Sequence, residues 1–258
     1  MIIQLPKKVI FTFITWNKTI FILLFLMQIN LLFSQKAIQN QANWFAYTGQ
    51  YKVSQKWGLH LEAQFRMDGD LEVSRQNLFR LGAIYYPSKN SNFIAGYGLI
   101  NTLNPSVNAY FKENRIWEQY QHTYQWSASK NTMINRFRLE QRFVDKVGLV
   151  DQEVARLETN YQNRFRYLNR NLFFLTTVNK NKDELYVIVQ DEVFLNIGSN
   201  NVNGNFFDQN RLFLGFGLLT NNNFRIEVGY LNHFVNPNSG AANINHTVSV
   251  SLLHNLTF

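Results

Sequence analysis

The chain has 258 residues, of which 46% are hydrophobic, 16% aromatic and 16% charged, and it contains no cysteine. The absence of cysteine excludes a disulfide scaffold and thiolate metal sites. The formal charge is +8, and Lys7, Lys8 and Lys18 supply three of these charges, which leaves five on the remainder. The arginines are dispersed among glutamates and form no basic run, so we expect no nucleic-acid partner.

Residues 1–34 are predicted to be a signal peptide. Lysines flank an apolar segment at residues 20–27, and Ser34 lies at a plausible cleavage point. The alternative is a retained helical anchor, but polar residues interrupt the apolar run, which is shorter than a comfortable membrane span. We therefore expect export of the protein and a mature domain of residues 35–258.

Apolar and polar residues alternate along most of this domain, and a period of two is the pattern of a β-strand. The clearest case is residues 57–67, where apolar side chains share one face and His60, Glu62 and Arg66 share the other. The predicted strands, in chain order, are residues 44–54, 57–67, 79–85, 93–99, 113–126, 133–143, 155–168, 172–178, 185–197, 209–219, 224–234 and 246–258.

The two faces of these segments point to a membrane. The polar face carries charged and amide groups along its full length, as a lumen does, and the apolar face is long enough to cross hydrocarbon. Residues 172–178 are the exception, being short and apolar on both faces. The pattern predicts an all-β fold, a single antiparallel transmembrane β-barrel of about twelve strands.

The last predicted strand ends on the aromatic residue Phe258. Such an ending is typical of outer-membrane barrels, whose last strand closes the barrel and is read by the assembly machinery. We therefore expect the protein in the outer membrane of a Gram-negative cell. Its expected partners are outer-membrane lipids and the barrel assembly machinery.

An even strand number would return both termini to the periplasm. The loops at 198–206 and 235–243 would then be extracellular. The remaining long connections would be periplasmic, at residues 68–74, 103–112 and 143–153, although periplasmic turns are usually short. A miscounted strand near residues 168–184 would change this assignment.

Short motifs are distributed along the whole domain. They are Lys52-Val-Ser-x-Lys-Trp57 with Glu62 and Arg66, Gln76-x-x-x-Arg80, Ala95-Gly-Tyr-Gly98, Glu113-Asn-Arg-x-Trp-Glu-Gln119, Asn135-Arg-x-Arg-Leu-Glu-Gln-Arg142, Asp191-Glu-Val-Phe194, Asp208-Gln-Asn-Arg211 and Glu227-x-Gly-Tyr230. Through these motifs, residues 43–258 resemble an uncharacterised family of bacterial outer-membrane barrel proteins, classified as a domain of unknown function. The resemblance implies a barrel in the outer membrane and implies no chemistry.

The inward face is predicted to carry a lumen charge network. Its members are Glu62, Arg66, Arg80, Arg115, Arg136, Arg138, Glu140, Arg142, Arg156, Glu158, Arg164, Arg166, Glu192, Arg211, Arg225 and Glu227. An arginine on the lipid face would cost about 2–4 kcal/mol at the midplane, so these residues are expected inside. Two roles fit them: a structural network that braces the wall, or a narrow pore for small anionic solutes.

No catalytic residue, cofactor or metal site is predicted, and the protein is not expected to be an enzyme. Ser249 and Ser251 are expected to point inward, opposite Gly229 and Glu227, and neither pairs with a histidine. The five histidines are His60, His122, His233, His246 and His254. Two alternatives stay open: an outer-membrane lipid-modifying enzyme and a soluble periplasmic all-β lipid carrier.

Overall fold

The computed structural model describes residues 37–126, 130–178, 183–198, 200–220, 224–238 and 240–258, and residues 1–34 lie outside this part of the chain. The strands are β1 (Ile38–Lys52), β2 (Trp57–Asp68), β3 (Ser74–Tyr85), β4 (Ser91–Asn104), β5 (Ala109–Gln125), β6 (Thr132–Val150), β7 (Glu153–Thr177), β8 (Glu184–Ile197), β9 (Phe207–Leu219), β10 (Phe224–Val235) and β11 (Asn243–Thr257). None of the described residues belongs to a helix long and apolar enough to cross a membrane.

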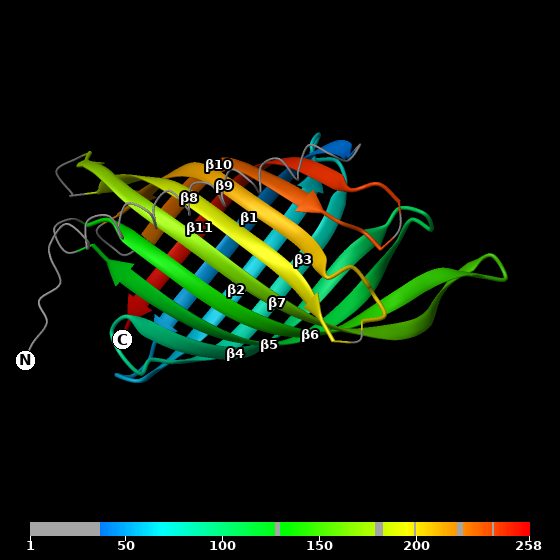
Figure 1. Ribbon diagram of the computed structural model, residues 1–258, viewed down its shortest axis with the longest axis horizontal. Helices are drawn as coiled ribbons and strands as arrows, with labels where there is room; N and C mark the ends of the chain where they lie inside the picture. The colour runs from blue at the N-terminus through cyan, green and yellow to red at the C-terminus, as the bar shows by residue number, and fades with distance from the viewer. Residues whose placement is uncertain (1–36, 127–129, 179–182, 199, 221–223, 239) are drawn as a thin grey trace, which may run out of the picture. The chain divides into compact units, whose positions relative to one another are not determined.

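The strands form one closed barrel in which each strand pairs with its neighbours in the chain (Figure 1). Consecutive strands are antiparallel, as expected, but β1 and β11 pair in parallel where the barrel closes. The parallel pair follows from the strand number. In the described residues there are eleven strands, and an odd number makes the first and the last run in the same direction.

The predicted count of about twelve strands is therefore corrected to eleven. Residues 155–168 and 172–178, predicted as two strands, belong to the single strand β7. The expected break at Asn169–Asn171 is absent because the ladders to both neighbours continue through it. The side chains there also have partners: Asn169 donates to Asn135 of β6, and Arg170 donates to Glu227 of β10.

The corrected strand number also changes the end of the barrel at which each loop lies. The β6–β7 hairpin extends past the neighbouring strands as a two-stranded ribbon (residues 145–160), and we call its end of the barrel the ribbon rim (Figure 1). The expectation that the long connections divide between two ends is wrong. Those at 68–74, 103–112, 143–153, 198–206 and 235–243 all lie at the ribbon rim. The opposite end, which we call the turn rim, joins its strands by four to six residues.

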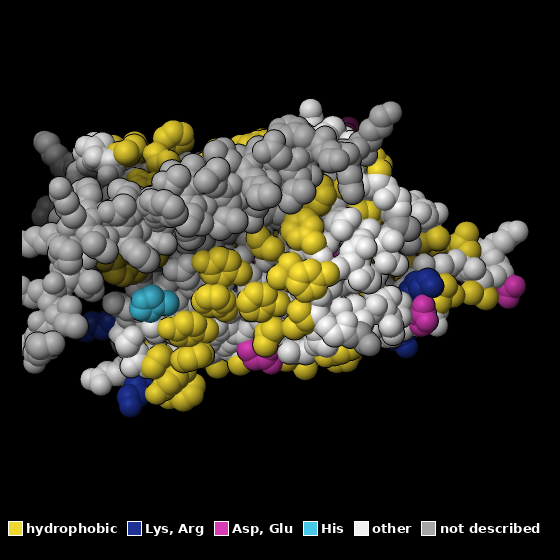
Figure 2. Space-filling view, viewed as in Figure 1, with side chains coloured by type: hydrophobic (Ala, Val, Ile, Leu, Met, Phe, Trp, Pro, Cys, Tyr) yellow, Lys and Arg dark blue, Asp and Glu magenta, His cyan; other side chains and the backbone are white. Residues whose placement is uncertain are grey.

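The predicted alternation of faces is confirmed along the strands. In β2, His60 and Glu62 are buried in the barrel, whereas Leu59 and Leu61 are exposed on its outer wall. Apolar side chains cover much of the described wall on the face shown in Figure 2. The barrel is thus charged inside and apolar outside.

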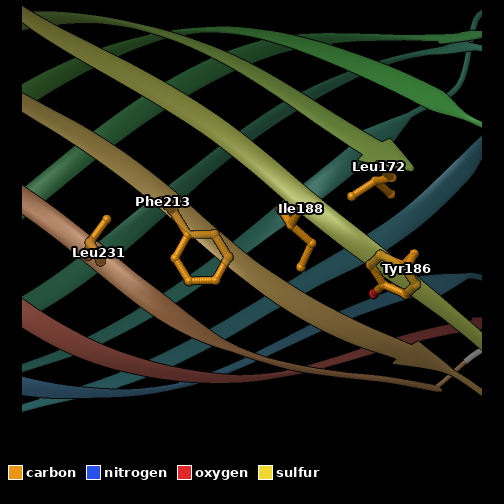
Figure 3. Packing of buried hydrophobic residues seen from close by; sticks show 5 residues of the cluster. All are labelled: Leu172, Tyr186, Ile188, Phe213 and Leu231. Atoms are coloured by element: carbon orange, nitrogen blue, oxygen red, sulfur yellow. The ribbon is translucent and has the colours of Figure 1, made fainter. Parts of the chain in front are cut away.

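Two small apolar clusters lie within this interior. The larger follows the β7–β10 wall and comprises Leu172, Tyr186, Ile188, Phe213 and Leu231 (Figure 3). The smaller comprises Ile84, Ile94 and Trp117. Gly96 makes room for Trp117, because a Cβ atom at residue 96 would lie 2.8 Å from Cζ2 of the indole. The small inward residue Gly96 thus accommodates a bulky neighbour in the interior.

Candidate functional site

Glu140 on β6 lies at the centre of the interior network, and its side chain is fully buried. Arg164 and Arg166 on β7 donate to its two carboxylate oxygens, at 2.7 and 2.6 Å. The arginines within 4 Å of this carboxylate are Arg80, Arg115, Arg138, Arg164 and Arg166. Side chains from β3, β5, β6 and β7 therefore converge on one negative charge, although β3 pairs with none of the other three strands.

Glu192 on β8 forms a second centre. Arg136 and Arg166 each donate to its Oε1 at 2.6 Å, and Nη1 of Arg211 lies 3.9 Å from its Oε2. Arg166 thus joins the Glu140 and Glu192 centres. Three guanidinium groups share this carboxylate, and among the described residues only Arg166 has a second carboxylate partner, Glu140.

Three further glutamates pair with donors on the interior wall, and Asp208 accepts from Arg164 at 2.9 Å. Glu62 accepts from Arg80 at 2.9 Å, and Glu113 accepts from Arg142 at 2.8 Å. Glu227 on β10 accepts from Arg170 on β7 at 2.5 Å and from the Tyr186 hydroxyl at 2.7 Å. The Arg170 contact spans two intervening strands, so the network braces the barrel across its lumen.

Several of the guanidinium groups lie over aromatic rings. Arg66 lies 4.0 Å and Arg211 lies 4.9 Å from the centre of the Trp44 ring. Arg211 also lies 4.4 Å from the Phe194 ring, as does Arg166. Cation–π contacts stabilise a desolvated guanidinium without neutralising it. They contribute to the stability of Arg66, Arg166 and Arg211 in the interior.

Arginines exceed carboxylates on the described interior wall by five. The arginines are Arg66, Arg80, Arg115, Arg136, Arg138, Arg142, Arg164, Arg166, Arg170, Arg211 and Arg225. The carboxylates are Glu62, Glu113, Glu140, Glu192, Asp208 and Glu227. Buried charges are normally paired, so this surplus needs a counter-charge or a local mode of stabilisation.

A cavity of about 280 Å³ occupies the interior on one side of Glu140. Its lining includes Gln50, Arg225 and Asn255, which lie close to the ends of their strands at the turn rim. We call it the turn-rim cavity. Seven arginines and three carboxylates line it, together with apolar side chains such as Phe213 and Leu231.

The ribbon rim is closed by its own loops. Asn203, in the β8–β9 loop, is buried and donates to Asp208 at 3.0 Å and to the backbone oxygen of Asn236 at 2.8 Å. Asn205 donates to the backbone oxygen of Pro237 at 2.7 Å. These bonds join the β8–β9 and β10–β11 loops over the interior, so the cavity and the loops lie toward opposite rims.

Most of the chain matches one protein family. Residues 41–245 match the family described as protein of unknown function (DUF2490). The chain belongs to this family. No curated protein and no solved structure matches it significantly. Membership in DUF2490 assigns no activity to this chain.

The barrel places fourteen of the sixteen predicted network residues on its interior wall and two elsewhere. Arg156 and Glu158 lie on the ribbon, where Arg156 contacts Asp145 and Glu158 contacts Lys146. Their assignment to the lumen is corrected, because β6 and β7 continue beyond the strands that would enclose them. Hydrogen bonds from Lys146 and Asn160 lower the pKa of Glu158, as suits an exposed ion pair.

Several interior residues were missed from the sequence. Arg170 was missed because the predicted break in β7 removed it from any strand. Glu113 was missed although it alternates with Arg115, Trp117 and Gln119, all of which are buried. That inward face was the available signal, and the ladders from β5 to β4 and β6 run without a register shift. Glu118 lies on the outer wall, where Gln141 donates to it.

A serine–histidine contact was also missed. Oγ of Ser91 lies 2.9 Å from Nδ1 of His122, on adjacent strands at the turn rim. Within the described part of the chain, no hydrogen bond orients the other ring nitrogen of His122, and acyl-transfer chemistry needs such an orienting group. Ser249 and Ser251 lie opposite Gly229 and Glu227, as predicted. The described residues contain no group of three histidine or acidic residues able to hold a metal ion.

Proposed function

We propose that this member of DUF2490 is an outer-membrane β-barrel with a structural role, whose lumen is closed by buried ion pairs. The observation that carries the proposal is the polarity of the wall. Leu81 and Phe216 are 56% and 60% exposed on the outside, whereas Arg138 and Glu140 are 2% and 1% exposed. A water-soluble barrel would expose its charges and bury its apolar residues. Lipid around the barrel would stabilise the arrangement found here.

The dimensions support the same proposal. Every described strand has at least twelve residues, and a tilted membrane strand needs about 9–11. In this proposal outer-membrane lipids cover the wall, residues 1–34 direct export, and the assembly machinery receives the last strand with Phe258. The proposed orientation has the ribbon rim outside the cell, because the protruding ribbon and the two longest connections, residues 198–206 and 236–242, lie there. Extracellular connections are the longer ones in bacterial barrels.

The Glu140 centre favours a closed lumen over an open one. Five arginines meet this carboxylate in the interior, and a passing ion would have to separate buried charge pairs. Breaking a buried pair costs about 3–5 kcal/mol. A narrow anion-selective pore is the second candidate, and the surplus of arginines on the interior wall is the observation that favours it.

Two other candidates have less support. A soluble lipid carrier needs an apolar interior, whereas this interior holds buried arginines and carboxylates. The Ser91–His122 contact favours a lipid-modifying enzyme, but a base without an orienting group is poorly placed for that chemistry. We therefore propose a protein without enzymatic activity.

Planar-bilayer conductance of the refolded protein tests the proposal, with heat-modifiable gel migration as the control for folding. We expect a silent bilayer. Steady anion-selective conductance steps would contradict the structural role. If Arg138→Glu and Arg166→Glu reduced these steps, the pore would be supported. Fractionation tests the location, since release of the protein from membranes without detergent would contradict it.

A further inference from the structure

The turn-rim cavity combines a surplus of positive charge with apolar side chains. Its lining has seven arginines against three carboxylates, which leaves four positive charges without a counter-charge from the lining. The same lining includes apolar side chains, most of which alternate with the arginines along the strands: Ile134, Leu168, Phe213, Leu231 and Leu253. An interior that only braced the barrel would need neither the surplus of arginines nor the apolar side chains around this cavity.

The positive charge of the cavity lining is least balanced around Glu192. Its carboxylate lies within 4 Å of Arg136, Arg166 and Arg211, all of which line the cavity. Arg166 has a second carboxylate partner in Glu140, but Glu192 is the only one described for Arg136 and Arg211. The three guanidinium groups around this one carboxylate repel one another strongly where water is scarce. An added negative charge would relieve that repulsion.

Unused hydrogen-bond donors occur at the same place. The Nε atoms of Arg136 and Arg211 are buried and have no hydrogen-bond partner among the described residues. The Arg211 residue as a whole is only 9% exposed. Buried donors are almost always paired, and an unpaired one destabilises the fold. The guanidinium groups of Arg136 and Arg211 are therefore incompletely satisfied by the described residues, and both residues line the cavity in which an anion could contact them.

We propose that the turn-rim cavity binds a small organic anion, a carboxylate or a phosphate ester with an apolar part. Its oxygen atoms accept hydrogen bonds from Arg136 and Arg211, and its apolar part packs against Phe213 and Leu231. The cavity volume of about 280 Å³ lies at the lower end of the range for ligand sites and suits a small ligand. Entry is from the turn rim, because loops cover the ribbon rim.

This inference goes beyond the proposed structural role and does not require a membrane. Binding is therefore tested by calorimetric titration of the refolded protein in neutral detergent. Benzoate and phenyl phosphate are the probes, and benzyl alcohol and benzylamine are their uncharged and cationic counterparts. We expect saturable binding of one or both anions and none of the counterparts. Preference between the anions identifies the headgroup as carboxylate or phosphate.

Three variants locate the site. Arg211→Gln and Arg136→Gln are each expected to weaken binding about tenfold, as loss of one charge-assisted hydrogen bond does. Arg156→Gln removes the same charge from the exposed ribbon and should leave binding unchanged. Glu192→Gln removes the carboxylate that competes with the ligand and should tighten binding.

The tightening by Glu192→Gln separates a ligand site from a structural network, because a purely structural role predicts destabilisation without any gain in binding. The proposal is overturned by the absence of saturable binding, by equal binding of benzyl alcohol, or by equal weakening in Arg156→Gln. If Arg211→Gln or Arg136→Gln fails to fold, Arg211→Lys takes its place; it keeps the charge but loses the guanidinium donors, so a smaller loss of affinity is expected. Unchanged affinity in that variant would also overturn the proposal.

Discussion

The guanidinium group of Arg80 on β3 lies 3.6 Å from the carboxylate of Glu140 on β6, although β4 and β5 separate the two strands in the sheet. The contact crosses the lumen and does not follow the wall. It makes Glu140 a point at which strands that share no backbone hydrogen bonds are held together. The stability of the barrel should therefore depend on this carboxylate more than on any exposed one.

Glu140→Gln should destabilise the barrel by about 3–5 kcal/mol, because five buried arginines lose their shared counter-charge. The measurement is urea unfolding in detergent, followed by heat-modifiable gel migration. Glu158→Gln is the matched control on the exposed ribbon and should change stability by less than about 0.5 kcal/mol. Equal midpoints for the two variants would contradict a bracing role for Glu140.

Leu81→Arg tests whether the outer wall contacts lipid. The side chain is exposed on the barrel wall, where arginine would cost about 2–4 kcal/mol in hydrocarbon and little in water. Leu149→Arg is the matched control, since Leu149 is equally exposed but lies on the ribbon beyond the barrel. We expect reduced assembly into the outer membrane for Leu81→Arg alone. Normal assembly of both variants would argue against a lipid-facing wall.

Gly217→Ala should destabilise the barrel by about 1–3 kcal/mol, as overpacking of a filled interior does. A Cβ atom at residue 217 would overlap the ring of Tyr186, whose hydroxyl donates to Glu227. Gly204→Ala is the control, because its Cβ atom would meet only Asn238 Oδ1 at 3.4 Å. Thermal unfolding in detergent compares the two, and equal melting temperatures would show that Tyr186 has room to move.

The chain has no cysteine, so a single introduced thiol reports which rim faces the outside of the cell. Asp151→Cys places a thiol at the tip of the ribbon, in a two-residue turn with φ values of 50° and 67° at Asp151 and Gln152. We expect a membrane-impermeant maleimide to label this thiol on intact cells. Ser88→Cys, at the turn rim, should be labelled only after lysis. The reverse result would invert the proposed orientation.

The inward or outward direction of most side chains on the wall could be predicted from the sequence, because it depends on residues that are neighbours in the chain. Neighbouring residues of a strand point to opposite faces, so alternation alone assigned Leu59 outward and Glu62 inward. Alternation could not show where a strand ends relative to its neighbours. Arg156 and Glu158 keep the correct period on β7 but lie on the ribbon, beyond the enclosing strands.

The sequence by itself determined that the chain is built of strands with one charged and one apolar face, because that property depends only on residues close together in the chain. The tertiary structure decided that there are eleven strands, since the ladders through Asn169 and Arg170 are made by other strands. It also decided which arginine meets which carboxylate. Those pairs join residues as far apart in the chain as Arg80 and Glu140, and only the register and the closure of the barrel bring them together.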